Sequence, residues 1–144
     1  MGAASPGSRE VTGVAPFLKP GVTLDTGALI ALESGSRRMA VLVETALASR
    51  TELAVPAGVV AQAWRGGSRQ VRLAKLLRAS VTSVIPLDQR LALRVGARSA
   101  VTGIADVVDV SVALCAHDRG HAVVTSDPDD IYAVEPSLTL LSPA

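Results

Sequence analysis

The chain has 144 residues, of which 49% are hydrophobic, and its 14 basic and 13 acidic residues leave a formal net charge of +1. This length suits one domain that buries a core without disulfide or metal staples, and the lone Cys115, a predicted core residue, excludes an internal disulfide. The longest uncharged run, Leu53 to Trp64, contains a proline and a glycine and is too short for a membrane span. With no secretory signal pattern at the start, we expect a cytoplasmic protein that does not use a membrane.

The first 20 residues contain glycine, serine and three prolines without a regular period. This composition predicts a flexible N-terminal tail over residues 1–20. The folded domain is expected to span residues 21–144.

From residue 21 onward, segments with strand and helix patterns alternate. Short apolar and β-branched runs predict strands over 22–24, 53–55, 81–87, 121–125 and 138–141. Apolar residues at helical spacing predict helices over 27–32, 37–50, 56–64, 69–79, 88–100, 105–118 and 127–133. This alternation predicts an α/β domain with a central parallel sheet of four or five strands and helices on both faces.

Basic residues concentrate between Arg65 and Arg98, which hold eight bases and a single acid, Asp88. The rest of the chain is therefore acidic. Such a surface can bind a polyanion such as RNA, dock a partner protein or only face solvent. The candidates for RNA contact are Arg65, Arg69, Arg72, Arg90 and Arg94. The three aromatic residues are too few for an extended base-stacking platform.

Asp25 lies where the first predicted strand meets a helix. In a parallel α/β sheet the carboxyl ends of the strands form the ligand crevice, so a carboxylate there is well placed for chemistry. The alternative is a helix cap formed by Asp25 or Thr26.

Asp106 and Asp109 are three residues apart on one predicted helix, near its first turn. There the helix dipole favours negative charge, so either could be a capping acid. Asp109 is harder to explain in this way, because it lies within the apolar stretch VVDVSVALCA. A buried carboxylate needs a metal ion, a cation or hydrogen-bond donors.

A third acidic junction, TSDPDD from Thr125 to Asp130, follows the strand AVV. Asp127 with Asp130 three residues later also fits a capping box, with Pro128 at the first helical position. Taken together, aspartates at three such junctions favour a site for a hard cation such as Mg²⁺, which prefers oxygen ligands beside a phosphate.

These motifs, LDTGALIAL, DVSVALCA and VVTSDPDDI, occur in an order and spacing that resemble the PIN-domain nucleases over residues 22–140, and in particular the compact VapC-like ribonuclease toxins. The resemblance implies a ribonuclease that hydrolyses phosphodiester bonds with Mg²⁺ or Mn²⁺. It implies Asp25, Asp109 and Asp127 as catalytic metal ligands, Thr26 and Thr125 as supporting hydroxyls, and Asp106 or Asp130 as auxiliary acids. It also implies an antitoxin partner and a homodimer.

One position departs from the family pattern. The family places a glutamate on the helix after the second strand, where this chain has Gln62 in VPAGVVAQAWRGG. A glutamine offers a carbonyl oxygen but no charge, so the rival hypothesis is a weakened or inactive PIN-like module that binds RNA or protein.

Three other enzyme or signalling classes fit poorly. A phosphoaspartate phosphatase needs a second acid two residues after the nucleophile, where Gly27 stands. A phosphoacceptor receiver needs a late lysine, and the chain has only Lys19 and Lys75. A nucleophile elbow is absent.

The pair His117 and His121 is expected at a helix end and the following strand, not as a metal site.

Overall fold

The computed structural model describes residues 18–144, so the predicted tail lies outside the described residues except for its last three positions. Leu18, one of those three, is buried in the core. The described residues form five strands, namely β1 (Gly21–Leu24), β2 (Glu52–Pro56), β3 (Thr82–Ile85), β4 (Ala122–Val124) and β5 (Leu140–Leu141). The helices are α1 (Thr26–Glu33), α2 (Arg37–Ser49), α3 (Ala57–Ala63), the 3-10 helix η3 (Ser68–Gln70), α4 (Val71–Arg78), α5 (Gln89–Thr102), α6 (Val107–Arg119) and α7 (Pro128–Val134).

All strand pairs are parallel, and the strands are ordered β3-β2-β1-β4-β5. Val22 of the central strand lies opposite Leu53 on one side and Ala122 on the other. The predicted fold class is confirmed. The chain runs from β1 outward to β3 and then returns to β4 on the other side, so the strand order reverses between β1 and β4. In such sheets this switch point, at the carboxyl ends of the strands, is where ligands bind.

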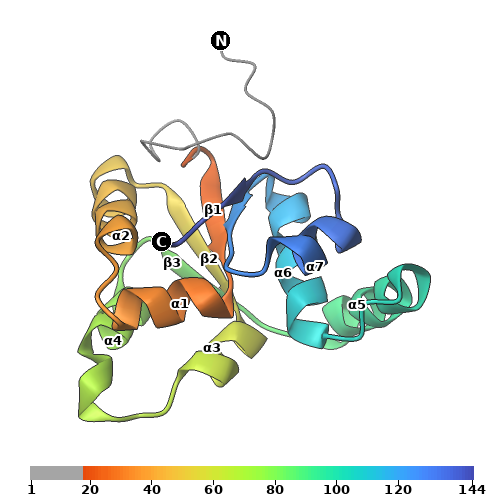
Figure 1. The fold of residues 1–144 in the computed structure, drawn as a ribbon, viewed down its shortest axis with the longest axis horizontal. Coiled ribbons are helices and arrows are strands. Elements are labelled where there is room, and N and C mark those ends of the chain that lie inside the picture. The colour runs from red at the N-terminus through yellow and green to blue at the C-terminus, as the bar shows by residue number, and fades with distance from the viewer. Residues whose placement is uncertain (1–17) are drawn as a thin grey trace.

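The helices form two layers around the sheet (Figure 1). Helices α1, α2 and α4 lie on one side, and α5, α6 and α7 lie on the other, while α3 lies at the end of the sheet where β1 continues into α1. Each crossover is long enough to return the chain to the same end of the sheet. The strand ends and the first turns of α1, α6 and α7 are therefore brought together.

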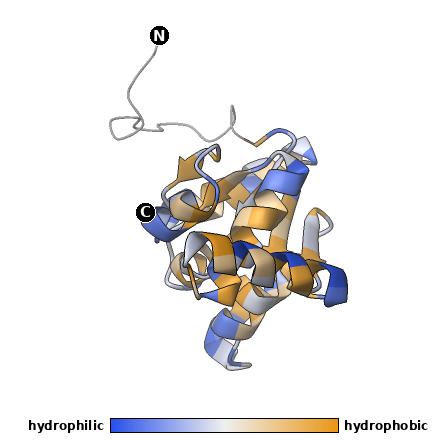
Figure 2. Ribbon diagram, turned by 90° about the vertical axis from the view of Figure 1, so that its right-hand side faces the viewer, coloured by the Kyte–Doolittle hydropathy of each residue, from blue (hydrophilic) through white to orange (hydrophobic). Residues whose placement is uncertain are grey.

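The core lies between the sheet and these helices. Seven consecutive residues of α6, from Val110 to Ala116, are buried, which is why this helix reads as almost uniformly apolar. They include Cys115, as predicted. Hydrophobic residues follow the strands and the inner helix faces, and hydrophilic residues gather at outer turns (Figure 2). Within residues 18–144 no single helix is long and apolar enough to cross a membrane, and the one pair that reaches this length, α5 with α6, is bent by 107°.

Candidate metal centre

Asp25 follows β1 directly and caps α1, with its Oδ1 accepting a hydrogen bond from the Ala28 N–H at 2.9 Å. The capping interpretation is thus confirmed, but it does not account for the burial of this side chain, which is 4% exposed. Burial raises the pKa of Asp25, and hydrogen bonds from the Thr125 side chain and nearby backbone N–H groups partly offset the rise. Within the described residues, no salt bridge involves Asp25.

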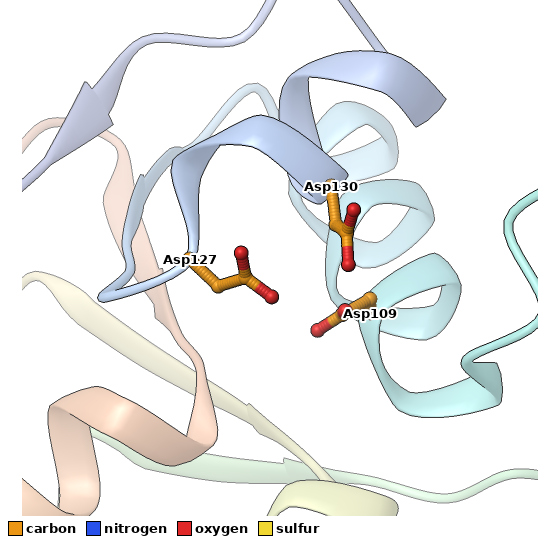
Figure 3. Close-up of side chains that lie close together, drawn as sticks. All are labelled: Asp109, Asp127 and Asp130. Atoms are coloured by element: carbon orange, nitrogen blue, oxygen red, sulfur yellow. The ribbon is translucent and has the colours of Figure 1, made fainter.

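Asp106 is the N-cap of α6, where its Oδ1 accepts hydrogen bonds from the N–H groups of Val108 at 2.9 Å and Asp109 at 3.1 Å. The capping alternative is confirmed for this residue. Since Asp106 satisfies the helix end, Asp109 is not needed for that purpose. Asp109 is half-buried in the first turn of α6, on the side of the helix that faces α7 (Figure 3).

Asp127 precedes α7 at the N-cap position, with Pro128 at the start of the helix as predicted. The predicted capping box is wrong, because the Asp127 side chain makes no capping hydrogen bond. Instead, the Asp127 N–H donates to Thr125 Oγ1 at 2.8 Å. The Asp127 carboxylate points toward Asp109 and Asp130 (Figure 3).

Three carboxylates meet at this point. One oxygen from each of Asp109, Asp127 and Asp130 lies within 4.8 Å of the other two (Figure 3). We call these three residues the acidic trio. The resemblance implies only an auxiliary role for Asp130, whereas the fold groups its carboxylate with those of Asp109 and Asp127, and the buried Asp25 is not a member of that group. The position of Asp130 one helical turn after Asp127 is the sequence signal that fits this placement.

The charges of the trio reinforce one another. Burial, followed by the charges of Asp106, Asp127, Asp130 and Asp25, raises the pKa of Asp109 to about 7. Desolvation and the charge of Asp130 raise the pKa of Asp127, and the charge of Asp25 adds to this rise. Asp25 therefore lies within electrostatic reach of the trio. Carboxylates that share a site without a cation repel one another.

The donor set fits a hard divalent cation. Its members are carboxylates from α6 and α7, with Asp25 of the β1–α1 junction beside them, and none of them forms a salt bridge in the part of the chain that the structure describes. Mg²⁺ and Mn²⁺ prefer oxygen ligands and are held by a few carboxylates together with water and substrate phosphates. Sulfur and imidazole ligands, which would favour zinc, are not part of this cluster.

A close approach that the sequence did not predict supports the centre. A Cβ placed on Gly27 would lie 1.7 Å from Ser126 Oγ and 2.6 Å from Ser126 Cβ. Only glycine lets the first turn of α1 pass so near the loop that carries Asp127. The GALIAL pattern read as a helix gives no sign of this contact, because Ser126 is 99 positions away along the chain.

Gln62 of α3 is linked to the site by a contact with the first residue of α1. Its Oε1 accepts a hydrogen bond from Thr26 Oγ1, the residue that follows Asp25. The side chain is exposed and contributes no charge. The helix that carries Gln62 thus lies next to the β1–α1 junction, and the correspondence of Gln62 with the family's glutamate stays a prediction.

The predicted RNA-binding arginines fall in two separate regions. Arg65, Arg69 and Arg72 lie in or beside the α3–α4 connection, where Arg65 donates to the Ala61 and Trp64 carbonyls and Arg72 donates to that of Glu33. Arg90 and Arg94 lie on α5, where Arg94 forms a two-pronged pair with Asp118 at 2.6 and 2.8 Å. The charge of Arg94 is therefore already matched within the fold.

A family model and two solved structures match most of this chain. Residues 22–135 match the PIN domain. One match is a structure of FitAB bound to an IR36 DNA fragment, whose sequence is 16% identical to this chain and whose superposition has a TM-score of 0.56. The match covers 85% of this chain and 94% of the FitAB chain. A second match is the structure of FitAcB from Neisseria gonorrhoeae, whose sequence is 18% identical to this chain, with a TM-score of 0.55. It covers 85% of this chain and 97% of the FitAcB chain. No curated protein matches closely enough to count as a relative. The family match covers most of the chain, and the chain therefore belongs to the PIN-domain family.

Proposed function

We propose that this protein is a metal-dependent ribonuclease that hydrolyses RNA phosphodiester bonds, and that it is the toxin of a toxin–antitoxin pair. The observation that carries the proposal is the acidic trio beside the buried Asp25, at the switch point of the sheet. PIN domains are in general nucleases, and carboxylates that no basic side chain of the described residues neutralises are what a metal-dependent nuclease uses to hold its cation. The sequence resemblance to VapC-like toxins supports the finer assignment.

Asp25, Asp109 and Asp127 would hold the cation, with Asp130 within reach of the same ion. Bound Mg²⁺ or Mn²⁺ would supply an activated water and stabilise charge on the phosphate. Thr125 positions two of these acids at once, because its side chain hydrogen-bonds to Asp25 and its Oγ1 accepts the Asp127 N–H. Asp106 fixes the first turn of α6 and so the direction of Asp109.

The basic residues of the α3–α4 connection and of α5 would bind the RNA backbone. Contacts of this kind give salt-dependent affinity with little base specificity. By the same resemblance, we expect a cytoplasmic homodimer whose activity is blocked by a small antitoxin.

The test is incubation of purified protein with a single-stranded RNA, with EDTA or with added Mg²⁺ or Mn²⁺, followed by gel analysis of the fragments. We expect cleavage only with metal, and none by Asp25→Asn. Glu44→Gln is the matched control, because Glu44 is an exposed acid of α2 that does not belong to the acidic trio. A DNA strand of the same sequence tests the preference for RNA. Cleavage that persists in EDTA or in Asp25→Asn would refute the proposal.

A specific observation favours a second candidate, a PIN-like module that binds RNA without cutting it. Gln62 supplies an amide where a fourth charge would stand in the family pattern, and this amide is already hydrogen-bonded to Thr26. RNA binding without cleavage at any metal concentration would favour the module over the enzyme.

A further inference from the structure

The connection between α3 and η3 exposes the chain's single tryptophan. Trp64 follows α3 directly and is 41% exposed, and residues 65–69 after it are also exposed. We call residues 64–69, sequence WRGGSR, the tryptophan loop. Tryptophan is enriched at binding interfaces, and an aromatic ring beside positive charge can serve as a platform on which a base stacks.

The tryptophan loop is held in one shape by a buried amide. Gln70 Oε1 accepts hydrogen bonds from the N–H groups of Arg65 at 2.7 Å and Gly66 at 3.0 Å. Its Nε2 donates to the Ala63 carbonyl at 2.8 Å and to Glu33 Oε1 at 2.7 Å. Gly66 adopts a left-handed backbone conformation, with φ +77°, that favours glycine. The loop is therefore ordered before any ligand binds, which lowers the entropy cost of binding.

The loop is connected to the β1–α1 junction through α3, which packs against both α1 and α6. Gln62, whose side chain contacts Thr26 next to Asp25, lies two residues before Trp64. Two residues advance an α-helix by about 3 Å and turn it by about 200°, so the backbone of Trp64 stays close to that of Gln62 although the two side chains point in different directions. An RNA strand with one phosphate at the carboxylates would thus reach Trp64 within a few nucleotides.

The charge around the ring suits a nucleic acid. Arg65 and Arg69 lie within the tryptophan loop, and Arg72 follows on the first turn of α4. The nearest acid that the structure ties to this region, Glu33, is bonded to Gln70. Arginine beside an exposed aromatic ring is the combination that grips phosphates while a base stacks on the ring.

We infer that the tryptophan loop is a base-stacking subsite for the RNA strand, in which Trp64 stacks on one unpaired base and Arg65 and Arg69 bind the flanking phosphates. The inference rests on the proposed function, since it names how that site would hold its substrate. It adds one aromatic contact to a chain otherwise too poor in aromatics for an extended platform. The subsite would favour single-stranded RNA over duplex, because only an unpaired base offers its face.

The test uses the tryptophan as its own reporter. In EDTA, we expect a short single-stranded RNA to quench the Trp64 fluorescence, and an abasic strand of the same length to bind more weakly without quenching. By anisotropy of labelled RNA, Trp64→Ala should weaken binding about 5- to 150-fold, the range measured for loss of one stacked base. Trp64→Phe should restore most of the affinity. Leu47→Ala, at an apolar side chain of α2 that is as exposed as Trp64, is the matched control and should bind as the wild type does.

Arg69→Glu should weaken RNA binding and lower its salt dependence, whereas Arg78→Glu, at the far end of α4, should change either much less. The subsite is overturned if Trp64→Ala binds RNA with unchanged affinity, or if the abasic strand quenches the fluorescence equally. If Trp64→Ala instead loses a protein partner, Trp64 belongs to a protein-docking surface. Stacking without cleavage would refute the enzyme and leave the subsite standing. Metal-dependent cleavage by the wild type, together with unchanged RNA affinity in Trp64→Ala, would refute the subsite and leave the proposed enzyme standing.

Discussion

Polar side chains cluster at both ends of the central sheet, and the two clusters differ in how their hydrogen-bonding and charged groups are satisfied. Toward the amino ends of the strands, His121 Nδ1 lies 3.0 Å from Thr23 Oγ1, and its Nε2 lies 3.3 Å from Glu52 Oε1. Arg119 Nε donates to the same Glu52 oxygen at 3.2 Å. At the carboxyl ends, Asp25 and the acidic trio lie close enough for their charges to interact, and none of them forms a salt bridge in the described residues.

The difference separates a structural network from a candidate functional one. Groups of opposite charge that hydrogen-bond to one another offset much of their desolvation cost, so the amino-end network is explained by the fold alone. Carboxylates gathered without a cation destabilise the metal-free fold. Strained or repulsive arrangements of this kind are found mainly at functional sites.

The largest expected effect is on catalysis. Asp109→Asn should reduce RNA cleavage on the order of 10²-fold or more, because it removes a metal ligand, while leaving the fold intact. Glu52→Gln, the equivalent change at the amino end, should lower stability and leave cleavage per folded molecule unchanged. Cleavage assays with circular dichroism on both variants make the comparison. Equal activity of Asp109→Asn and the wild type would break it.

The two ends should also respond to pH with opposite signs. The pKa of Asp109 rises from 3.8 to about 7 on folding, so the native state holds an extra proton between these values and the free energy of unfolding falls as pH rises from about 4 to 7. Burial lowers the pKa of His121 below 6.5, so the unfolded state holds the extra proton there and stability falls as pH drops below 6.5.

Each proton contributes a slope of at most about 1.4 kcal/mol per pH unit. Urea unfolding in EDTA between pH 4.5 and 8 should show that Asp109→Asn loses the decline toward pH 7 and that His121→Gln loses the decline in acid. Mg²⁺ should stabilise the wild type at pH 7.5 and Asp109→Asn much less. The same pH profile in both variants would contradict the contrast between the two ends.

Gly27→Ala tests how tightly the carboxyl end is built. The added methyl group collides with Ser126, so we expect a loss of about 1–3 kcal/mol in stability together with weaker metal binding as the Asp127 loop shifts. Ser126→Gly removes both colliding atoms, so the double variant should recover metal affinity. Failure of the double variant to recover would place the strain elsewhere.

Gln62→Glu adds charge to the carboxyl end alone. If this side chain reaches the ion, Mg²⁺ or Mn²⁺ should bind about two- to five-fold more tightly, and the metal-free protein should become slightly less stable. Both effects have one cause, so they should appear together. Gln62→Met controls for loss of the Thr26 hydrogen bond. Unchanged metal affinity and stability would place Gln62 outside the site.

The smallest effect is expected for a pair that has opposite charges but is not buried. Arg94 and Asp118 have side chains that are 42% and 40% exposed, so Asp118→Asn should cost at most about 1 kcal/mol. Glu52 also meets the buried His121, so thermal unfolding of Glu52→Gln in parallel would show that contact with a buried partner, and not pairing alone, makes the amino-end network the more important one for stability. A larger loss for Asp118→Asn would contradict this.

The sequence by itself determined the order and type of the elements and the fold class. Strand and helix periods depend on residues a few positions apart, and short β-branched runs such as Ala122–Val124 or the long apolar stretch of α6 carry that signal directly. The same local reasoning located Asp25, Asp109 and Asp127 at strand ends and helix starts, since the ends of parallel strands meet at one edge.

Only the tertiary structure decided which of these groups meet. The membership of Asp130 in the acidic trio, the approach of Gly27 to Ser126 and the pairing of His121 with Glu52 depend on how α6, α7 and β1 pack. It also decided that Asp127 leaves its helix uncapped and that Arg94 is matched by Asp118, while Arg69 stays exposed in the tryptophan loop. The physical reason is distance along the chain. A local pattern indicates which way a side chain faces, but the partner it meets lies tens of residues away and is set by register and packing.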